Sequence, residues 1–172
     1  MSFPNNSFTF SAWMYSRGYR NQGSVYNCIA GAGDFADTGW GAGIYSSEKA
    51  FVGLAAGQGP SMNNISNLIN NWHHVVVIQD VVNNKLNIYF DGIFASSTTT
   101  KEISGTSNFY LGREGTAGRF NNQLLDEVRI YNIALSLSEV KQNYIAGLNS
   151  LLASGSILKE EYDQRLNNLA QK

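Results

Sequence analysis

The sequence predicts an all-β protein, a two-sheet antiparallel β-sandwich or jelly roll, that ends in a C-terminal α-helical hairpin. Segments in which apolar and polar residues alternate recur from residue 8 to about residue 133, and this period of two is typical of strands. Gly, Asn and Ser separate the segments, which suits tight turns. After residue 134 the apolar spacing becomes three and four, which indicates helices. We therefore expect a sandwich over residues 1–135 and a helical hairpin over residues 136–172, packed on the sandwich or on a partner.

Nine segments have the alternation and the flanking turn residues of strands: 8–16, 24–33, 39–47, 49–57, 73–80, 85–91, 92–99, 108–112 and 123–132. The most clearly marked connection joins residues 73–80 to residues 85–91. Asn83 and Asn84 end this connection, and asparagine tolerates the positive φ that a tight hairpin turn demands. We expect an antiparallel hairpin there. A length of 172 residues is one that a single sandwich commonly uses.

The tail has the apolar spacing of two helices. The first stripe consists of Leu137, Val140, Tyr144, Leu148 and Leu151, and the second of Ile157, Glu161, Tyr162, Leu166 and Leu169. Ser136 or Ser138 is available as the N-cap of the first helix. The SGS segment then interrupts the pattern, which predicts a hairpin of two helices.

Composition and charge exclude several classes of function. A formal net charge of −1 offers no attraction to a nucleic-acid backbone or an anionic membrane. No apolar stretch approaches the roughly 20 residues that span a bilayer, and the start MSFPNNSF lacks the basic and apolar parts of a signal peptide. The single cysteine, Cys28, cannot form an intramolecular disulfide and is expected to be a small buried thiol. Only 15% of the residues are charged, and uncharged polar surfaces are common on proteins outside the cell.

Three blocks of the sequence carry a family likeness. FTFSAWMYS (8–16), NWHHVVVIQDVVNNKLNIYFDG (71–92) and NFYLGREGTAGRFNNQLLDEVRIYNIALSLSEVKQNY (108–144) resemble, in this order, the concanavalin A-like lectin/glucanase superfamily. The likeness is strongest to the laminin-G-like, pentraxin-related jelly rolls. Its most specific pieces are the Trp-x-His-Val start at Trp72 and the Tyr-x-Asp-Gly turn at Tyr89. The resemblance implies a jelly-roll sandwich with a lectin-like binding role.

The sequence departs from the family pattern at both ends. Family members usually carry a strand before the Phe-Thr-x-Ser-x-Trp element, and here only MSFPNNS precedes it. The chain is then either a piece of a longer exported protein or a sandwich with an unpaired sheet edge, which invites pairing with a second chain. The tail LNSLLASGSILKEEYDQRLNNL resembles the short helical hairpins at the ends of many bacterial proteins.

The adjacent histidines His73 and His74 are expected to be structural. In a strand, neighbouring side chains point to opposite faces, so the two rings cannot share one metal ion without distorting the strand. A histidine flanked by valines is more often a hydrogen-bonded sheet residue than a ligand.

No catalytic carboxylate pair is visible. Retaining glycosidases need two carboxylates about 5 Å apart, which a Glu-x-Asp-x-x-Glu strand would provide, and the sequence has no such strand. EEYDQ falls in the second predicted helix, and the adjacent acids of LLDEV would face opposite sides of a sheet. No Ser or Cys nucleophile with a matched base stands out. We therefore expect a protein that is not an enzyme.

Strict alternation places Asp126 on one strand face with Leu124, Val128 and Ile130. A carboxylate buried on that face would accept backbone N–H groups or pair with an arginine. Glu127 and Arg129 share the other face, where their spacing suits a surface ion pair of small energetic value.

A calcium site is the only cofactor that the sequence suggests. The loop AGAGDFADTGWG carries Asp34 and Asp37 near Trp40, and calcium prefers such oxygen ligands. The alternative is an ordinary turn in which the carboxylate of Asp34 accepts a hydrogen bond from the backbone of the same turn. The dense acidic cluster of the pentraxin site is missing.

Six residues at loops or strand ends could form a carbohydrate site. Trp40 and Tyr45 would stack on sugar rings, while the hydrogen-bonding groups would come from Arg113, Glu114, Arg119 and Asn121. For Trp40, which lies between two glycines, a place in the core is an equal alternative, whereas Trp13 and Trp72 are expected in the core. The polar connection 57–71 could rim a groove or be a solvated crossing.

These observations predict a non-enzymatic binding or adhesion module that recognises a glycan or a protein through loops of the sandwich. It would act outside the cell or at the cell surface, as part of a longer exported protein. The alternative is a structural or assembly domain that forms a homo-oligomer through a sheet edge or the C-terminal helices. A glycoside hydrolase is a third hypothesis, for which no carboxylate pair can be nominated.

Overall fold

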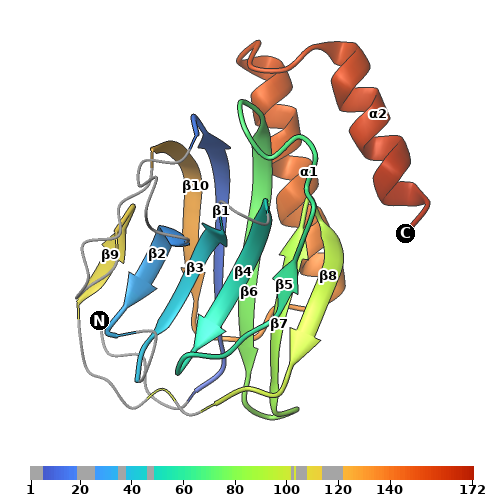
Figure 1. Ribbon diagram of the computed structural model, residues 1–172. Helices are drawn as coiled ribbons and strands as arrows, with labels where there is room; N and C mark the ends of the chain where they lie inside the picture. The colour runs from blue at the N-terminus through green and yellow to red at the C-terminus, as the bar shows by residue number, and fades with distance from the viewer. Residues whose placement is uncertain are drawn as a thin grey trace.

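The computed structural model describes residues 6–18, 26–34, 38–45, 49–101, 103, 108–113 and 122–172. Two antiparallel sheets lie face to face, followed by two helices (Figure 1). The strands are β1 (Phe8–Ser16), β2 (Tyr26–Ala32), β3 (Trp40–Tyr45), β4 (Ala50–Ala55), β5 (Ser61–Met62), β6 (Trp72–Asp80), β7 (Lys85–Phe90), β8 (Ile93–Thr98), β9 (Phe109–Leu111) and β10 (Gln123–Tyr131). The helices are α1 (Leu137–Ala153) and α2 (Lys159–Ala170). The predicted fold class, a two-sheet β-sandwich with a C-terminal helical hairpin, is confirmed.

Sheet A has the strand order β10-β1-β6-β7-β8, and sheet B has the order β5-β4-β3-β2-β9. All nine predicted strands form, whereas the two-residue strand β5 has no pattern that would predict it. The hairpin of β6 and β7 pairs Asp80 with Lys85 and Ile78 with Asn87. Asn84 adopts the positive φ that its place in the turn predicts.

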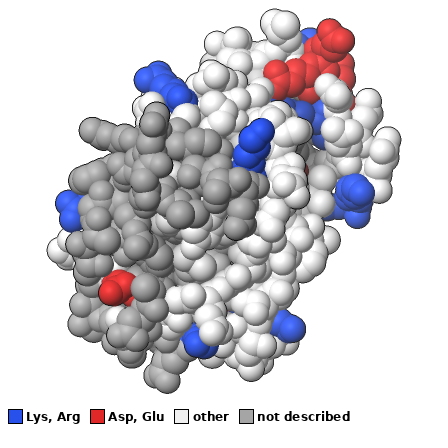
Figure 2. Space-filling model, viewed as in Figure 1, with Lys and Arg blue, Asp and Glu red and all other residues white. Residues whose placement is uncertain are grey.

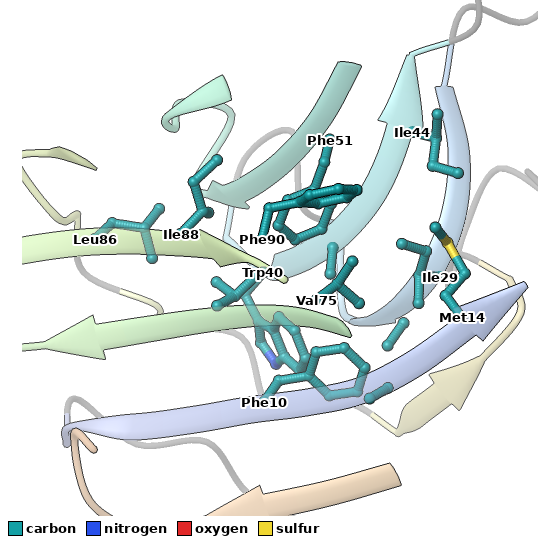
Figure 3. Packing of buried hydrophobic residues seen from close by; sticks show 14 of the residues in the cluster. Phe10, Met14, Ile29, Trp40, Ile44, Phe51, Val75, Leu86, Ile88 and Phe90 are labelled. Atoms are coloured by element: carbon teal, nitrogen blue, oxygen red, sulfur yellow. The ribbon is translucent and has the colours of Figure 1, made fainter. Parts of the chain in front are cut away.

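The main core lies between the two sheets. Alternate residues of β1, β6 and β7 face those of β2, β3 and β4, and Phe10, Trp40, Phe51, Val75 and Ile88 are buried among them (Figure 3). This arrangement follows from the period-two patterning, because each strand turns its apolar residues toward the opposite sheet.

Helix α1 covers the outer face of sheet A. Val140 packs on Val76 and Ile78 of β6, while Tyr144 and Leu148 pack with Trp13 of β1. Sheet A is therefore buried on both faces, which explains why β6 contains the unbroken run HHVVVIQ rather than an alternation. Leu169 of α2 joins the same cluster, so the apolar stripe of the tail packs on the sandwich.

A bulge in β10 corrects the expectation for Asp126. The register with β1 shifts between Ser11 and Trp13, and Glu127 has a φ of 51°. The bulge turns Leu125 and Val128 toward the core and leaves Asp126 exposed. The prediction that Asp126 is buried is wrong, because strict alternation cannot continue through a bulge. The ion pair between Glu127 and Arg129 is confirmed.

Candidate functional site

A groove of about 850 Å³ lies between helix α2, strand β8 and the connection before β6. We call it the α2–β8 groove. Strand β5, at the edge of sheet B, lies against β8, at the edge of sheet A, so the groove forms where the two sheets meet. Its lining combines Met62, Asn64, Ile65, Ser66, Asn67, Asn71, Phe90, Asp91, Ile93, Phe94, Ala95, Tyr144, Leu158, Glu160, Glu161, Gln164, Arg165, Asn168 and Lys172.

The turn between β7 and β8 brings the helices close to the strands. Asp91 and Gly92 both have positive φ, 50° and 75°, as a two-residue hairpin turn requires. A Cβ at Gly92 would lie 2.9 Å from the ring of Tyr144 and 3.1 Å from Leu169. Glycine is needed there because α1 and α2 both pack against the turn.

One face of α2 forms a polar wall of the groove. Its lining residues recur at spacings of three and four, at Glu161, Gln164, Arg165 and Asn168, and Lys172 follows just beyond the end of the helix. We call this face the helix wall. Figure 2 shows acidic side chains gathered at the upper right, where Figure 1 places α2. The opposite side, residues 64–71, presents Asn64, Ser66, Asn67 and Asn71 and is called the loop wall.

The charged groups in the groove largely pair with one another. Arg165 donates from Nε and Nη2 to Glu161 Oε1, at 2.9 and 2.7 Å. Its Nη1 lies 3.9 Å from Asp91 Oδ1. Burial raises the pKa of Asp91, but the positive charge and hydrogen bond of His73, with help from Arg165, outweigh this effect and lower the pKa below its ordinary value.

An aromatic side chain stands at the strand side of the groove. Phe94 of β8 is 50% exposed and contacts Tyr89 edge to face, with the ring centroids 5.6 Å apart. An exposed ring beside carboxamides is the combination that sugar recognition uses: the ring meets C–H groups, and the amides both donate to and accept from hydroxyls.

The structure overturns the expectation that Trp40 is a surface platform. Trp40 is completely buried and packs between Phe8 and Phe10, with centroids 5.1 and 5.6 Å away. Figure 3 shows its indole among the core residues between the sheets. Trp40 is a core residue, the alternative left open by its glycine neighbours. Trp13 is likewise buried, and Trp72 is half-buried.

Tyr45 does not share a site with Trp40. The two residues lie at opposite ends of β3, about 17 Å apart for five strand residues. They also face opposite sides of sheet B, since Trp40 joins the main core and Tyr45 packs on Tyr26 with centroids 5.4 Å apart. Arg113 lies over the ring of Tyr110, at 4.4 Å. Glu114, Arg119 and Asn121 lie outside the described residues, so this cluster stays a prediction.

The predicted calcium loop is described only in part. The carbonyl oxygen of Asp34 accepts hydrogen bonds from the amides of Thr38 and Gly39, at 2.9 and 2.6 Å, which closes a turn. Asp37 lies outside the described residues. Within the described ranges, no group of three or more His, Cys, Asp or Glu side chains is placed to hold a metal ion. Calcium at Asp34 and Asp37 remains a prediction.

The two histidines have separate structural surroundings, as predicted. His73 faces the inner side of sheet A and stacks on Phe90 at 4.7 Å. His74 faces α1, where its Nε2 hydrogen-bonds the hydroxyl of Ser11 at 2.9 Å and its ring packs on Trp13 and Tyr144. Both side chains are 1% exposed.

The two antiparallel sheets and their order define a jelly-roll-like β-sandwich. The chain belongs to the concanavalin A-like lectin/glucanase superfamily, whose family model matches residues 1–141. This match confirms the resemblance inferred from the sequence. It ends inside α1, so the helix wall of the groove lies beyond the family match. The comparison with curated proteins found no match.

Solved structures share the fold at low sequence identity. A "putative carbohydrate binding protein" from Bacteroides ovatus ATCC 8483 is similar with a TM-score of 0.66 and 21% identity, over 81% of this chain and 41% of that one. The receptor-binding domain of botulinum neurotoxin type G has a TM-score of 0.59 and 19% identity, over 83% and 38%. A Trypanosoma rangeli sialidase has a TM-score of 0.60 and 18% identity, over 81% and 23%. The chain thus spans less than half the length of each.

Sequence reasoning found one wall of the groove and missed the other. The polar connection 57–71 was predicted either to rim a groove or to be a solvated crossing, and its residues 64–71 form the loop wall. The polar face of α2 was not predicted, because the apolar stripe alone defines the helices of the tail. The recurrence of polar residues from Glu161 to Lys172 is the signal that could have revealed it. No helix in the described part of the chain is long and apolar enough to cross a membrane.

Proposed function

We propose that this domain is a non-enzymatic binding module that holds an uncharged glycan in the α2–β8 groove. The observation that carries the proposal is that both walls of the groove present carboxamides, Asn64 and Asn67 on one side and Gln164 and Asn168 on the other. Each carboxamide both donates and accepts hydrogen bonds, as sugar hydroxyls do. Phe94 supplies an exposed ring for the C–H face of a sugar.

The pairing of charges favours an uncharged ligand. The guanidinium of Arg165 is shared between Glu161 and Asp91 and offers little positive charge to an anionic sugar. Glu160 and Lys172 also line the groove and have opposite signs. Neither an acidic nor a basic ligand gains a net electrostatic attraction from this arrangement.

The fold supports a binding role. The proteins named above include one described as carbohydrate binding and one receptor-binding domain, and the chain belongs to a superfamily named for its lectins and glucanases. We further propose that the domain acts outside the cell or at its surface, in adhesion, as part of a longer exported protein. The assembly alternative loses support for the tail, because the apolar stripe of the tail packs on the sandwich.

The test is a glycan-array screen of the purified domain, with and without calcium, followed by calorimetric titration of the best neutral glycan. Asn168→Ala should weaken binding by roughly 2- to 10-fold, the effect of one lost hydrogen bond. Phe94→Ala should weaken it by roughly 10-fold, through the lost ring contact. Asn167→Ala is the matched control, because Asn167 is the adjacent residue of the same helix and does not line the groove.

Calcium-dependent binding would move the site toward Asp34 and Asp37. Binding that is unchanged in both groove variants would contradict the proposed site. An array on which no glycan binds would contradict the glycan assignment and favour a protein ligand.

A further inference from the structure

A series of polar contacts connects the two walls of the α2–β8 groove. Asp91, which lines the groove, lies at the centre of this series. Its Oδ2 accepts a hydrogen bond from His73 Nδ1 at 2.9 Å, and its Oδ1 accepts one from the backbone N–H of His74 at 2.9 Å. The side chain of Asp91 is 24% exposed, so water competes only partly with these contacts.

His73 extends this series to the loop wall. Its Nε2 lies 2.9 Å from the carbonyl oxygen of Asn67. Both ring nitrogens therefore face acceptors, a carboxylate on one side and a carbonyl on the other. A neutral imidazole has a single N–H, so both contacts are hydrogen bonds only when the ring carries two ring protons. Neutral His73 would place a nitrogen lone pair against an oxygen lone pair at one end.

Arg165 extends this series to the helix wall. Its guanidinium is 11% exposed, lies 3.9 Å from Asp91 and is held by Glu161 on the same helix. The other groups around the carboxylate are the ring of Tyr144 on α1 and the backbone amide of His74 on β6. The contacts thus run from the carbonyl of Asn67 through His73, Asp91 and Arg165 to Glu161.

We infer that Asp91 is the positioning residue of the groove: it connects the loop wall, through His73, to the helix wall, through Arg165, so that a change at either end alters both walls. Loss of the Arg165 cation leaves Asp91 without its partner on α2. Loss of the His73 ring removes the link between Asp91 and the carbonyl of Asn67. Either change loosens residues 64–71. The inference rests on the proposed function only in taking the groove as the ligand site, and the coupling is measured without ligand.

The test is native-state hydrogen exchange on the full chain. The reporter is the amide of Asn70, which donates to the carbonyl of Ser16 in β1 at 2.7 Å and does not line the groove. Arg165→Met keeps the length of the side chain and removes its charge. Lys159→Met is the matched control, because Lys159 is an exposed cation whose contacts, with Asp163 and the ring of Tyr162, lie within the same helix. We expect the Asn70 amide to exchange at least about fivefold faster in Arg165→Met and unchanged in Lys159→Met.

Two further comparisons separate coupling from general unfolding. The amide of Val77, in the centre of sheet A, must keep its protection in Arg165→Met, and Arg165→Lys should restore part of the Asn70 protection. If exchange accelerates in α2 alone while Asn70 is unchanged, the two walls are independent and the inference is wrong.

The variant Asp91→Asn provides the second arm. It removes the charge that faces both His73 and Arg165, so we expect the Asn70 amide to exchange faster in Asp91→Asn, and Arg165→Met added to it should bring little further acceleration. Fully additive effects of the two substitutions would overturn the inference, whether or not a glycan binds.

Discussion

The indole of Trp13 lies directly on the backbone of α1 at Gly147. A Cβ at this position would come within 2.6 Å of Trp13 Cε2, closer than any normal contact. On its other side Trp13 stacks on Tyr144, with the ring centroids 5.4 Å apart and the planes inclined by 14°. A glycine in the middle of the helix therefore lets α1 approach sheet A closely enough to bury its tryptophan.

Gly147→Ala tests this contact by the sign of its effect. Helix propensity alone predicts that the change stabilises the protein by about 1 kcal/mol. The collision with Trp13 predicts instead a loss of about 1–3 kcal/mol, as for overpacked cores. Urea denaturation followed by circular dichroism gives the free energy of unfolding. Gln142→Ala, at an exposed position of the same helix, is the control and should be nearly neutral.

Trp40→Ala should remove stability rather than a ligand contact. The side chain is fully buried beside Phe8, Phe10 and Phe109, and truncating a buried tryptophan costs about 3–5 kcal/mol. Thermal unfolding should show a strongly lowered Tm, and Trp40→Phe should recover part of it. A variant that keeps the wild-type Tm but loses glycan binding would return Trp40 to the ligand site.

Ser136 caps helix α1, and its removal should weaken the docking of the helix. The Ser136 hydroxyl accepts from the amide of Glu139, and the carboxylate of Glu139 accepts from the amide of Ser136, which is a complete capping box. Ser136→Ala should cost about 1 kcal/mol of unfolding free energy. Ser138→Ala, two residues further on and exposed, should change it by less than about 0.5 kcal/mol. Equal losses in the two variants would rule out the capping role.

Stability should fall between pH 6.5 and about pH 4 because of His74. Burial lowers the pKa of His74 from 6.5 to about 4, so in this window the unfolded chain binds a proton that the folded chain does not. The contribution of His74 to the free energy of unfolding is fully present above pH 6.5. It decreases as the pH falls toward 4, by roughly 3 kcal/mol in total. Chemical denaturation at a series of pH values measures the slope.

The variant His74→Gln isolates this contribution. It has no proton to bind, so its stability should depend less on pH between 6.5 and 4 than that of the wild type. Parallel pH profiles for the two proteins would show that His74 does not cause the loss. Asp91 acts in the same direction at lower pH, since its pKa is also lowered on folding.

Local patterns were sufficient for most of the elements. Alternation located the hairpin of β6 and β7, and Asn84 occupies the positive φ that its position required. Ser136 is the N-cap that the sequence offered as one of two choices. In each case the interactions that determine the structure join residues close together in the sequence, so local patterns are enough to predict them.

Features that depend on distant contacts were not predictable. Glu127 in the bulge has a positive φ, although it is neither a glycine nor an asparagine, the residues that would indicate such a backbone. The sequence therefore placed Asp126 on the wrong face of the strand. The position of Trp40 was ambiguous because both faces of β3 are buried, and alternation then no longer separates inside from outside. The groove depends on the approach of Arg165 to Asp91, which no local pattern records.

The packing of α1 on sheet A makes the order of synthesis matter. Translation delivers these strands before α1, and domains generally begin to fold from the N-terminal side. Until α1 emerges, Trp13, Val76 and Ile78 on the outer face of sheet A have no helix over them. A polypeptide terminated near residue 141 would keep that apolar patch open to chaperones and proteases. Helix α1 therefore shields from solvent an apolar face that the strands alone would expose.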